Sequence, residues 1–336
     1  MMESVQAALA ETAALFRDTR MWVFDVQIER MEADQVTLRG RVLEQNQLDA
    51  LREAVASRAP QVCLDSSGVT VLRTPSTPCV HVGTNLTSLH AGPSWLSEQL
   101  SQLLFGMEVE ILTQEGNWVY VRQADGYLGW AYRPYLSDAP VPEVTHIVVE
   151  PASIMRAAHN PQGEILSRVL GGTYVRLLSV QGDRAEIQAH QRGWINKADL
   201  RALNALPQSN TARRPVMMVD GTRMIGVPYL WGGCSANGID CSGLAQLMHR
   251  WVGLNIARDA DMQYEAGFKV EPPYRPGTLL FFGENGSARH ITHVAVSLGG
   301  WTILHSSRAR NGVYVDDVQG VAHLRESFAG AATYLY

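Results

Sequence analysis

Two of the four cysteines in this chain, Cys234 and Cys241, are separated by six residues in the glycine-rich segment PYLWGGCSANGIDCSGL (228–244). Such a pair can form a disulfide, supply half of a metal site, or include one nucleophile. Four cysteines among 336 residues are too few for a disulfide scaffold. A zinc site favours pairs spaced CxxC, which this spacing does not match. These counts disfavour a disulfide scaffold and a zinc site, and the case for a nucleophile depends on the residues around each cysteine.

Cys241 is the stronger candidate for this nucleophile. It directly precedes apolar residues at helical spacing (CSGLAQLMHRWVGL), which predicts that it lies at or near a helix N-terminus. The unpaired N–H groups and the dipole at such a position lower the pKa of a thiol and can hold a developing oxyanion. A single cysteine is more often a small buried apolar residue, so this interpretation needs a base nearby.

Two histidines on predicted strands could supply that base. HVAVSL begins with His293 and TILHSS contains His305, twelve residues later, on strands that can be neighbours in a meander. Acyl transfer by a thiol needs an imidazole and a third polar group that orients the imidazole. His290 competes with His293, but it lies in a polar loop, whereas His293 starts the apolar alternation. We expect His249 on the surface of the helix that follows Cys241.

The elements around these residues predict an α+β domain over residues 210–336. We expect helices over 215–224 and after Cys241, and strands over 278–282, 293–298 and 302–307. A helix followed by an antiparallel meander is typical of an α+β fold.

The first residues predict a separate small α/β domain (1–73) in which no residue looks catalytic. Its expected elements are a helix over 4–16, strands over 22–28 and 36–42, a helix over 45–58 and a strand over 62–72.

The middle of the chain contains an internal repeat. SEQLSQLLFGMEVEIL (97–112) aligns with GEILSRVLGGTYVRLL (163–178), and at the same offset Gly116 aligns with Gly182. Short alternating segments broken by Gly or Asn turns are typical of a small barrel. The two copies resemble bacterial SH3-like domains, over residues 78–140 and 145–203. Linkers are expected at 140–144 and 206–215.

Composition excludes several classes of function. Apolar residues make up 46% of the chain and charged residues 18%, and the net charge of −5 gives no electrostatic basis for binding nucleic acid or an anionic membrane. No run reaches the roughly eighteen apolar residues of a membrane-spanning helix. Glu3 and Glu11 interrupt the N-terminal segment, which also lacks the basic region of a secretory signal. We therefore expect a cytoplasmic chain, unless a leader has been removed.

Five motifs in the last third occur in the order PYLWGG, DCSGL, PGTLLFFG, HVAVSLGG and ILHSS. Over residues 215–336 they closely resemble the NlpC family of cell-wall cysteine peptidases, which implies a papain-like core. The paired SH3-like copies match the architecture of the family's γ-D-glutamyl-L-diamino acid endopeptidases. The predicted fold is therefore multidomain, with an α/β unit, two SH3-like β-barrels and an α+β peptidase domain.

The resemblance implies a role for each candidate catalytic residue. It makes Cys241 the nucleophile, His293 the general base and His305 the group that orients His293. It places Cys234 in a variable loop, where it has no role. It also implies that the hydroxyl of Tyr229 projects into the site and helps to polarise the scissile carbonyl or to hold the substrate.

The resemblance also implies a pocket for the free α-amine of an N-terminal L-alanine, with Asp240 as one carboxylate. Ser242 and Trp231 are further candidate substrate contacts, although Trp231 could also be a core aromatic. In these enzymes an acidic residue of the first SH3-like domain closes the pocket, and Glu98 is our candidate. Glu98 could also be an ordinary surface residue, because Glu164 occupies the equivalent place in the second copy.

These residues and the resemblance predict a cysteine peptidase of cell-wall peptide recycling. It would cleave the γ-D-Glu–diamino acid bond of the murein-derived peptide L-Ala-γ-D-Glu-meso-diaminopimelate, or its lysine equivalent. No metal or organic cofactor is implied, and no nucleic acid or membrane partner. Two other interpretations stay open: a secreted hydrolase of intact peptidoglycan, and a non-catalytic protein that binds wall peptides.

Overall fold

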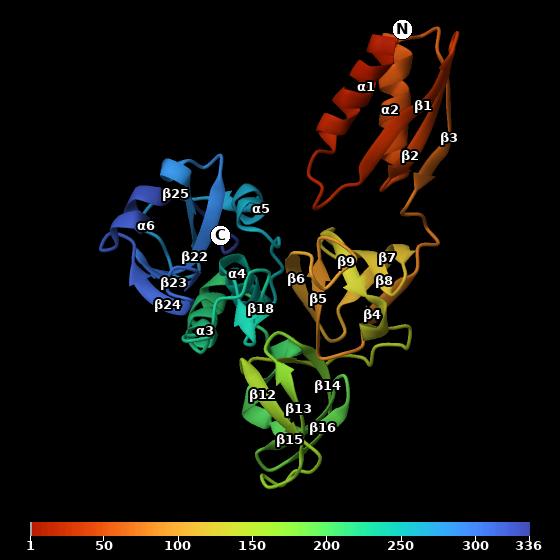
Figure 1. The fold of residues 1–336 in the computed structure, drawn as a ribbon. Helices are drawn as coiled ribbons and strands as arrows, with labels where there is room; N and C mark the ends of the chain where they lie inside the picture. Colours follow the sequence, from red (N-terminus) through yellow and green to blue (C-terminus); the bar gives the residue numbers. More distant parts are fainter. Residues whose placement is uncertain (1) are drawn as a thin grey trace. The chain divides into compact units, whose positions relative to one another are not determined.

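The chain, seen in a computed structural model that describes residues 2–336, divides into two compact units (Figure 1). Unit 1 comprises the residues up to Val80 together with Gly92–Trp95 and Glu108–Pro134. Unit 2 comprises His81–Ala91, Leu96–Met107 and Tyr135–Tyr336. The range 78–140, which the sequence predicts as one domain, is therefore divided between the two units.

Unit 1 begins with two helices and a three-stranded sheet. These elements are α1 (Met2–Leu15), β1 (Phe24–Glu32), β2 (Gln35–Val42), α2 (Gln45–Arg58) and β3 (Cys63–Val71). β2 is the central strand, antiparallel to β1 and parallel to β3. Val5, Leu38 and Leu51 from the two helices and β2 are fully buried in one core. They meet because apolar residues alternate in the strand and recur at helical spacing in the helices.

The remaining strands of the first half are short and antiparallel. In unit 1, β7 (Glu108–Glu115), β8 (Trp118–Gln123) and β9 (Leu128–Tyr132) form a meander. In unit 2, β5 (Leu86–His90) and β6 (Gln99–Leu104) form a hairpin. β4 (Cys79–Val82) pairs with β10 (Leu136–Ser137) through residues of unit 2.

A seven-stranded antiparallel sheet in unit 2 has the order β13-β12-β16-β15-β14-β11-β17. Its strands are β11 (His146–Val148), β12 (Ala152–Arg156), β13 (Ile165–Leu170), β14 (Tyr174–Gln181), β15 (Arg184–Gln188), β16 (Arg192–Asn196) and β17 (Leu200–Ala202). Short 3₁₀ turns lie at Arg133–Tyr135, Lys197–Asp199, Leu203–Ala205 and Glu284–Gly286.

Strands recur along the chain at the offset of the sequence repeat. β5, β6, β7 and β8 begin at Leu86, Gln99, Glu108 and Trp118, and β12, β13, β14 and β15 begin at the aligned positions Ala152, Ile165, Tyr174 and Arg184. The turns between β7 and β8 and between β14 and β15 place Gly116 and Gly182 at φ +56° and +61°. Glycine adopts this left-handed conformation most readily, so the aligned glycines have a shared structural cause.

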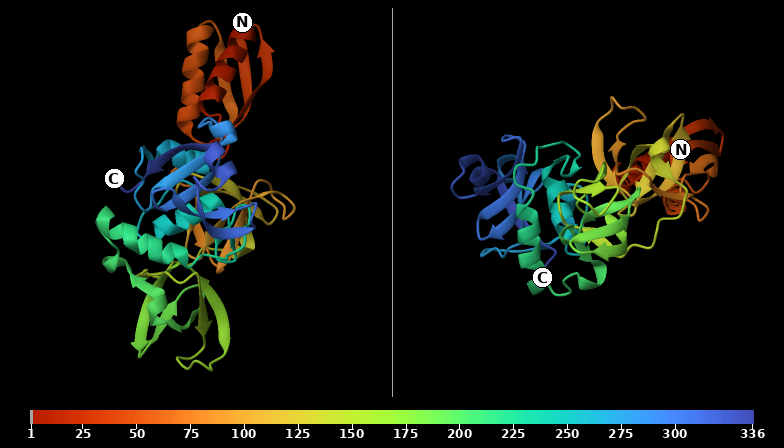
Figure 2. Two further views of the ribbon diagram at one scale, coloured as in Figure 1. Left: turned by 90° about the vertical axis from the view of Figure 1, so that its left-hand side faces the viewer. Right: turned by 90° about the horizontal axis from the view of Figure 1, so that it is seen from below.

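The C-terminal region of unit 2 is a six-stranded sheet of order β20-β25-β21-β22-β23-β24 with four helices. The helices are α3 (Asn210–Thr222), α4 (Cys241–Arg250), α5 (Ala260–Ala266) and α6 (Ala322–Ser327). The strands are β18 (Cys234–Ser235), β19 (Gly238–Ile239), β20 (Phe268–Lys269), β21 (Leu279–Gly283), β22 (Ile291–Gly299), β23 (Thr302–Ser307), β24 (Gly312–Asp317) and β25 (Phe328–Thr333), of which β18 and β19 pair separately. α4 packs against β22 and β23, as Figures 1 and 2 show.

Two features of this region differ from the sequence-based expectations. α3 begins at Asn210, before the expected start at Pro215, because the side chain of Ser209 caps it by accepting a hydrogen bond from the N–H of Ala212. His249 is fully buried, not on the helix surface. Its Nδ1 lies 2.7 Å from the carbonyl oxygen of Ala245, and its ring contacts Tyr334 edge to face.

The burial of His249 predicts a loss of stability in acid. Burial lowers the pKa of His249 to about 4, whereas an unfolded histidine titrates near ~6.5. The unfolded state therefore takes up a proton that the folded state refuses as the pH falls from 6.5 to 4. The free energy of unfolding should fall in this window by about 1.4 kcal/mol per pH unit from this group. Replacing His249→Gln should flatten the slope of urea-unfolding free energy against pH by that amount, and an unchanged slope would contradict the assignment.

Among residues 2–336, no helix is both long and apolar enough to cross a lipid bilayer.

Candidate active site

The candidate nucleophile is the first residue of α4. Asp240 is the N-cap, and its Oδ1 accepts a hydrogen bond of 2.7 Å from the N–H of Gly243. The cap thus uses the third N–H of the helix and leaves those of Cys241 and Ser242 without an oxygen acceptor in residues 2–336. Two adjacent N–H groups at a helix N-terminus can bind the oxyanion of an acyl-transfer intermediate.

Asp240 is held by a dense set of donors. Both Asp240 and Arg258 are buried, and their closest N–O distance is 2.6 Å. Oδ2 also accepts from the N–H of Gly232 at 2.9 Å, and the hydroxyl of Ser242 lies 3.2 Å from Oδ1. Both carboxylate oxygens are therefore occupied by groups of the protein, and Asp240 fixes the start of α4.

The surroundings of Cys241 oppose the thiolate in the free protein. Burial raises the pKa of the Cys241 thiol to about 12, and the charge of Asp240 acts in the same direction. The N–H groups of Val294 and Ser242 and the charge of Arg258 oppose this rise but do not overcome it. The expectation of a lowered pKa is therefore wrong, because burial and a neighbouring carboxylate raise the pKa more than the nearby N–H groups and Arg258 lower it.

The two predicted histidines come together on neighbouring strands. Val296 of β22 pairs with Leu304 of β23, and these two side chains lie on one face of the sheet. His293 is three residues from Val296 and His305 is one residue from Leu304, so both histidines lie on the other face. Nε2 of His293 lies 2.8 Å from Nδ1 of His305. Because Nε2 of His293 faces His305, Nδ1 is the nitrogen left to serve the thiol.

A third strand extends this contact with a carboxylate. His305 pairs with Tyr314 of β24, and Asp316 lies two residues further on the same face, diagonal to His305. Nε2 of His305 lies 2.9 Å from Oδ2 of Asp316. Arg310 donates to the other oxygen of Asp316 at 2.6 Å. The four side chains thus form one chain of contacts from Arg310 to His293.

The ionised carboxylate of Asp316 determines where the protons lie. An ionised carboxylate only accepts hydrogen bonds, so Nε2 of His305 carries a proton. Nδ1 of neutral His305 is then an acceptor, and it receives the Nε2–H of His293. Nδ1 of His293 is left with a free lone pair, which is the state that a general base requires.

The pKa shifts agree with this assignment. Burial raises the pKa of Asp316, but hydrogen bonds from His305 and Arg310 outweigh it and leave the pKa below its usual value. Burial lowers the pKa of His305 despite Asp316, and burial together with His305 lowers the pKa of His293 to about 3. The free site therefore holds a neutral thiol, two neutral imidazoles and one carboxylate.

The PYLWGG segment is held close to this site. Tyr229 forms a backbone bridge with Ile239, two residues before the nucleophile. Burial raises the pKa of the Tyr229 hydroxyl, and the nearby charge of Asp240 adds to the rise. The hydroxyl therefore stays protonated and can donate a hydrogen bond. Gly232 has φ +73°, and a Cβ there would lie 2.6 Å from the carbonyl oxygen of Gln99, so no other residue fits.

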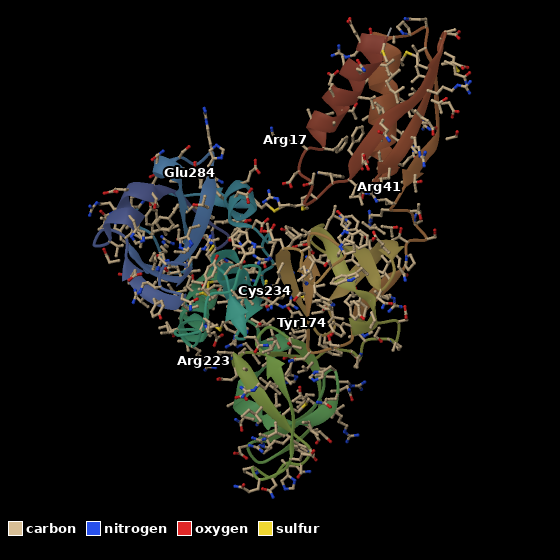
Figure 3. All side chains as sticks on the ribbon, viewed as in Figure 1. Arg17, Arg41, Tyr174, Arg223, Cys234 and Glu284 are labelled. Atoms are coloured by element: carbon tan, nitrogen blue, oxygen red, sulfur yellow. The ribbon has the colours of Figure 1, made fainter. Side chains whose placement is uncertain are left out.

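Strand β6 lines the same segment. Glu98 Oε1 accepts a hydrogen bond of 2.8 Å from the indole N–H of Trp231, whose side chain is 56% exposed, so Trp231 is a surface residue and not a core aromatic. Gln102 accepts from the N–H of Cys234 at 3.0 Å, and Ser101 accepts from Arg258 at 3.0 Å. Figure 3 labels Cys234 on β18, where it has no disulfide partner among residues 2–336.

The structure thus brings His293 and His305 into contact and places the N–H of Val294, the residue after His293, beside the sulfur of Cys241, whereas His290 is exposed. Sequence reasoning missed Asp316 and Arg310. The strand GVYVDD offers two acidic residues, and only the alternation that places Asp316 on the face of Tyr314 distinguishes it from Asp317.

The proton assignment predicts the effect of removing the Asp316 charge. In an Asp316→Asn variant the amide can donate to His305, which permits the opposite tautomers and protonates the basic nitrogen of His293. Alkylation of Cys241 by iodoacetamide near neutral pH, followed by mass spectrometry of its peptide, should slow by at least ~10-fold. Asp317→Asn is the matched control and should react at the wild-type rate. An Asp316→Asn protein that also reacts at that rate would show that Asp316 does not act on the thiol.

Comparison with known proteins gives two family matches. The NlpC/P60 family model matches residues 226–330, and the bacterial SH3 domain model matches residues 84–137. The crystal structure of an NlpC/P60 family protein from Bacillus cereus ATCC 10987 has the same fold, with a TM-score of 0.68 and 23% identity over 77% of this chain and all of that chain.

Two curated proteins extend the similarity beyond one domain. The chain is 29% identical over 255 residues to a gamma-D-glutamyl-L-lysine dipeptidyl-peptidase of Bacillus cereus (strain ATCC 10987 / NRS 248), over 70% of this chain and 75% of that protein. It is 28% identical over 233 residues to a Bacillus subtilis (strain 168) protein of the same name, over 64% and 74%. This chain therefore carries a cysteine peptidase domain of the NlpC/P60 family together with a bacterial SH3 domain.

Proposed function

We propose that this protein is an endopeptidase that cleaves the γ-D-glutamyl–diamino acid bond of murein-derived peptides with a free N-terminal L-alanine. The observation that carries the proposal is the hydrogen bond between Glu98 and Trp231. Trp231 belongs to the PYLWGG segment, whose next residue, Gly232, donates its N–H to Asp240 beside the nucleophile. The names of the two curated relatives support the same bond specificity. A cytoplasmic role in recycling wall peptides, and a second SH3-like domain over residues 145–203, are parts of this proposal.

The proposed reaction begins with a neutral thiol. Nδ1 of His293 takes the proton of Cys241 as the sulfur attacks the γ-carbonyl carbon, so thiolate and imidazolium form only as the C–S bond forms. The N–H groups of Cys241 and Ser242 hold the oxyanion, and the hydroxyl of Tyr229 is a third donor. His305 and Asp316 stabilise the imidazolium, because its Nε2–H donates toward them.

Collapse of this intermediate breaks the C–N bond. His293 returns its proton to the leaving amine, and the diamino acid part departs while L-Ala-D-Glu stays bound as a thioester. A water molecule, deprotonated by Nδ1 of His293, then attacks the thioester carbonyl. Release of L-Ala-D-Glu restores the thiol, and every proton taken up is returned.

Glu98 is the better placed carboxylate for the α-amine of the substrate. Its side chain is exposed and has one oxygen bonded to Trp231, which leaves the second oxygen for an ammonium group. Asp240 already receives bonds from Arg258 and from the N–H groups of Gly232 and Gly243. We therefore assign recognition of the amine mainly to Glu98, and the contribution of Asp240 stays a prediction.

The reaction is tested with a matched pair of peptides and a matched pair of variants. The purified protein should release L-Ala-D-Glu from L-Ala-γ-D-Glu-meso-diaminopimelate, detected by mass spectrometry, and release much less from the N-acetylated peptide. Cys241→Ala should lower the rate by at least ~10³-fold, whereas Cys234→Ala should retain it. Full activity of Cys241→Ala would overturn the mechanism, and equal cleavage of both peptides would remove the amine pocket. Cleavage of intact sacculi would favour a hydrolase of peptidoglycan.

The role of Glu98 has its own control in the repeat. Glu164 occupies the aligned position in the second copy, and the carbonyl oxygens of both residues accept matching bonds of 2.9 Å, from Ala91 and Ala157. Glu98→Gln should raise KM for the free peptide by at least ~10-fold with a smaller change in kcat, because a charge-assisted bond to the ammonium group is lost. Glu164→Gln should change neither constant. Equal effects of the two variants would show that Glu98 is an ordinary surface residue that does not bind the amine of the substrate.

A further inference from the structure

The seven-stranded sheet of unit 2 contains a polar cavity that the peptidase site does not use. Its volume is about 420 Å³, within the range of small-molecule sites. Its polar lining comes from β12, β15, β16 and the adjacent turns, and consists of Glu150, Ser153, Arg156, Arg184, Asn196 and Asp199.

Arg184 is the unusual member of this lining. It is only 8% exposed, and its guanidinium donates to neutral oxygens alone, the side-chain oxygen of Asn196 and the carbonyl of Trp194. Its Nε has no partner among residues 2–336. No carboxylate of residues 2–336 lies within 4.0 Å of this guanidinium. A buried cation without a counter-ion is costly, so its presence calls for an anion that occupies the cavity.

Asp199 presents the opposite charge to the same cavity. It is 9% exposed, and its carboxylate accepts a hydrogen bond from the hydroxyl of Ser153. At the rim, Glu150 lies 3.6 Å from Arg223, which Figure 3 labels, and Arg156 donates to the carbonyl of Gly163. Two buried charges of opposite sign thus line one cavity without pairing with each other.

The repeat shows that these charges are not required by the strands that carry them. When β15 is aligned with β8, Arg184 corresponds to Trp118, and when the Gly-Trp pair of β16 is aligned with that of β9, Asn196 corresponds to Tyr132. In unit 1 the rings of Trp118 and Tyr132 pack together, with centroids 5.5 Å apart. An apolar aromatic pair therefore serves at these strand positions, and replacing it by a buried charge points to a ligand.

We propose that this cavity binds the head group of an α-amino acid, with the carboxylate of the ligand on Arg184 and its ammonium group on Asp199. A ligand of either charge alone would leave one of the two buried groups unpaired, so both charges are needed on one small molecule. Arg156 and Asn196 supply further donors to the carboxylate. This site is separate from the proposed peptidase function and does not depend on it.

The test is calorimetric titration of the full-length Cys241→Ala protein, so that turnover does not contribute. The probes are meso-diaminopimelate, which carries both groups, pimelate, which lacks the amines, and 1,5-diaminopentane, which lacks the carboxylates. The proposal predicts saturable binding of diaminopimelate. Pimelate and 1,5-diaminopentane should bind at least ~10-fold more weakly than diaminopimelate. A cavity filled only by water would bind none of them, and that result, or equal binding of all three, would overturn the proposal.

Variants then assign the binding to this cavity. Arg184→Gln and Asp199→Asn should each weaken the binding of diaminopimelate by at least ~10-fold. Arg168 is an exposed arginine of the same sheet, and Arg168→Gln should leave this binding unchanged. Circular dichroism checks that each variant is folded, and the ligand series on the parent protein tests the chemistry even if one variant fails to fold. Binding that survives both cavity variants would place the ligand elsewhere and contradict the proposal.

Discussion

The contact on which the candidate active site depends is the one between Asp316 and His305. It fixes the direction of every hydrogen bond from Arg310 to His293, and through them it leaves a free lone pair on the nitrogen that serves Cys241. His293, His305 and Asp316 stand on the adjacent strands β22, β23 and β24, and the register of these strands sets the spacing of the three side chains. A slip of one residue in any strand would turn a side chain to the other face.

The position of the thiol depends on a second constraint, because α4 is held at both ends. Its start is fixed by Asp240 and Arg258, and Ser101 of β6 holds Arg258 in turn. At its C-terminal end, the indole N–H of Trp251 donates to the carbonyl of Val148, and Arg250 lies over the ring of Tyr174, which Figure 3 labels. Segments outside the peptidase motifs therefore orient the helix that carries the nucleophile. These contacts explain why β6 and the seven-stranded sheet of β11–β17 belong to unit 2 together with the candidate active site.

Much of the local structure could be predicted from the sequence. The helix over 45–58 and the strand over 302–307 have the predicted bounds, because periodicity and turn residues are local signals. The expected start of α3 is wrong because Pro215 is typical of a first helical turn, whereas Ser209 supplies the cap. Contacts between distant residues account for the other errors. His249 is buried partly by Tyr334, which belongs to the last residues of the chain, and Asp316 is recognisable only once β23 and β24 are paired.

The measurement that tests this account most directly is the protonation of the two histidines by ¹⁵N NMR of the free protein near neutral pH. The proton assignment predicts that His293 and His305 are both neutral, with the proton on Nε2. Nδ1 of His305 then accepts the hydrogen bond from His293, and Nδ1 of His293 has a free lone pair. Specific labelling and a His305→Gln variant would distinguish their signals. A proton on Nδ1 of His293, or an imidazolium paired with a thiolate, would contradict the claim that Asp316 prepares His293 as the base for a neutral thiol.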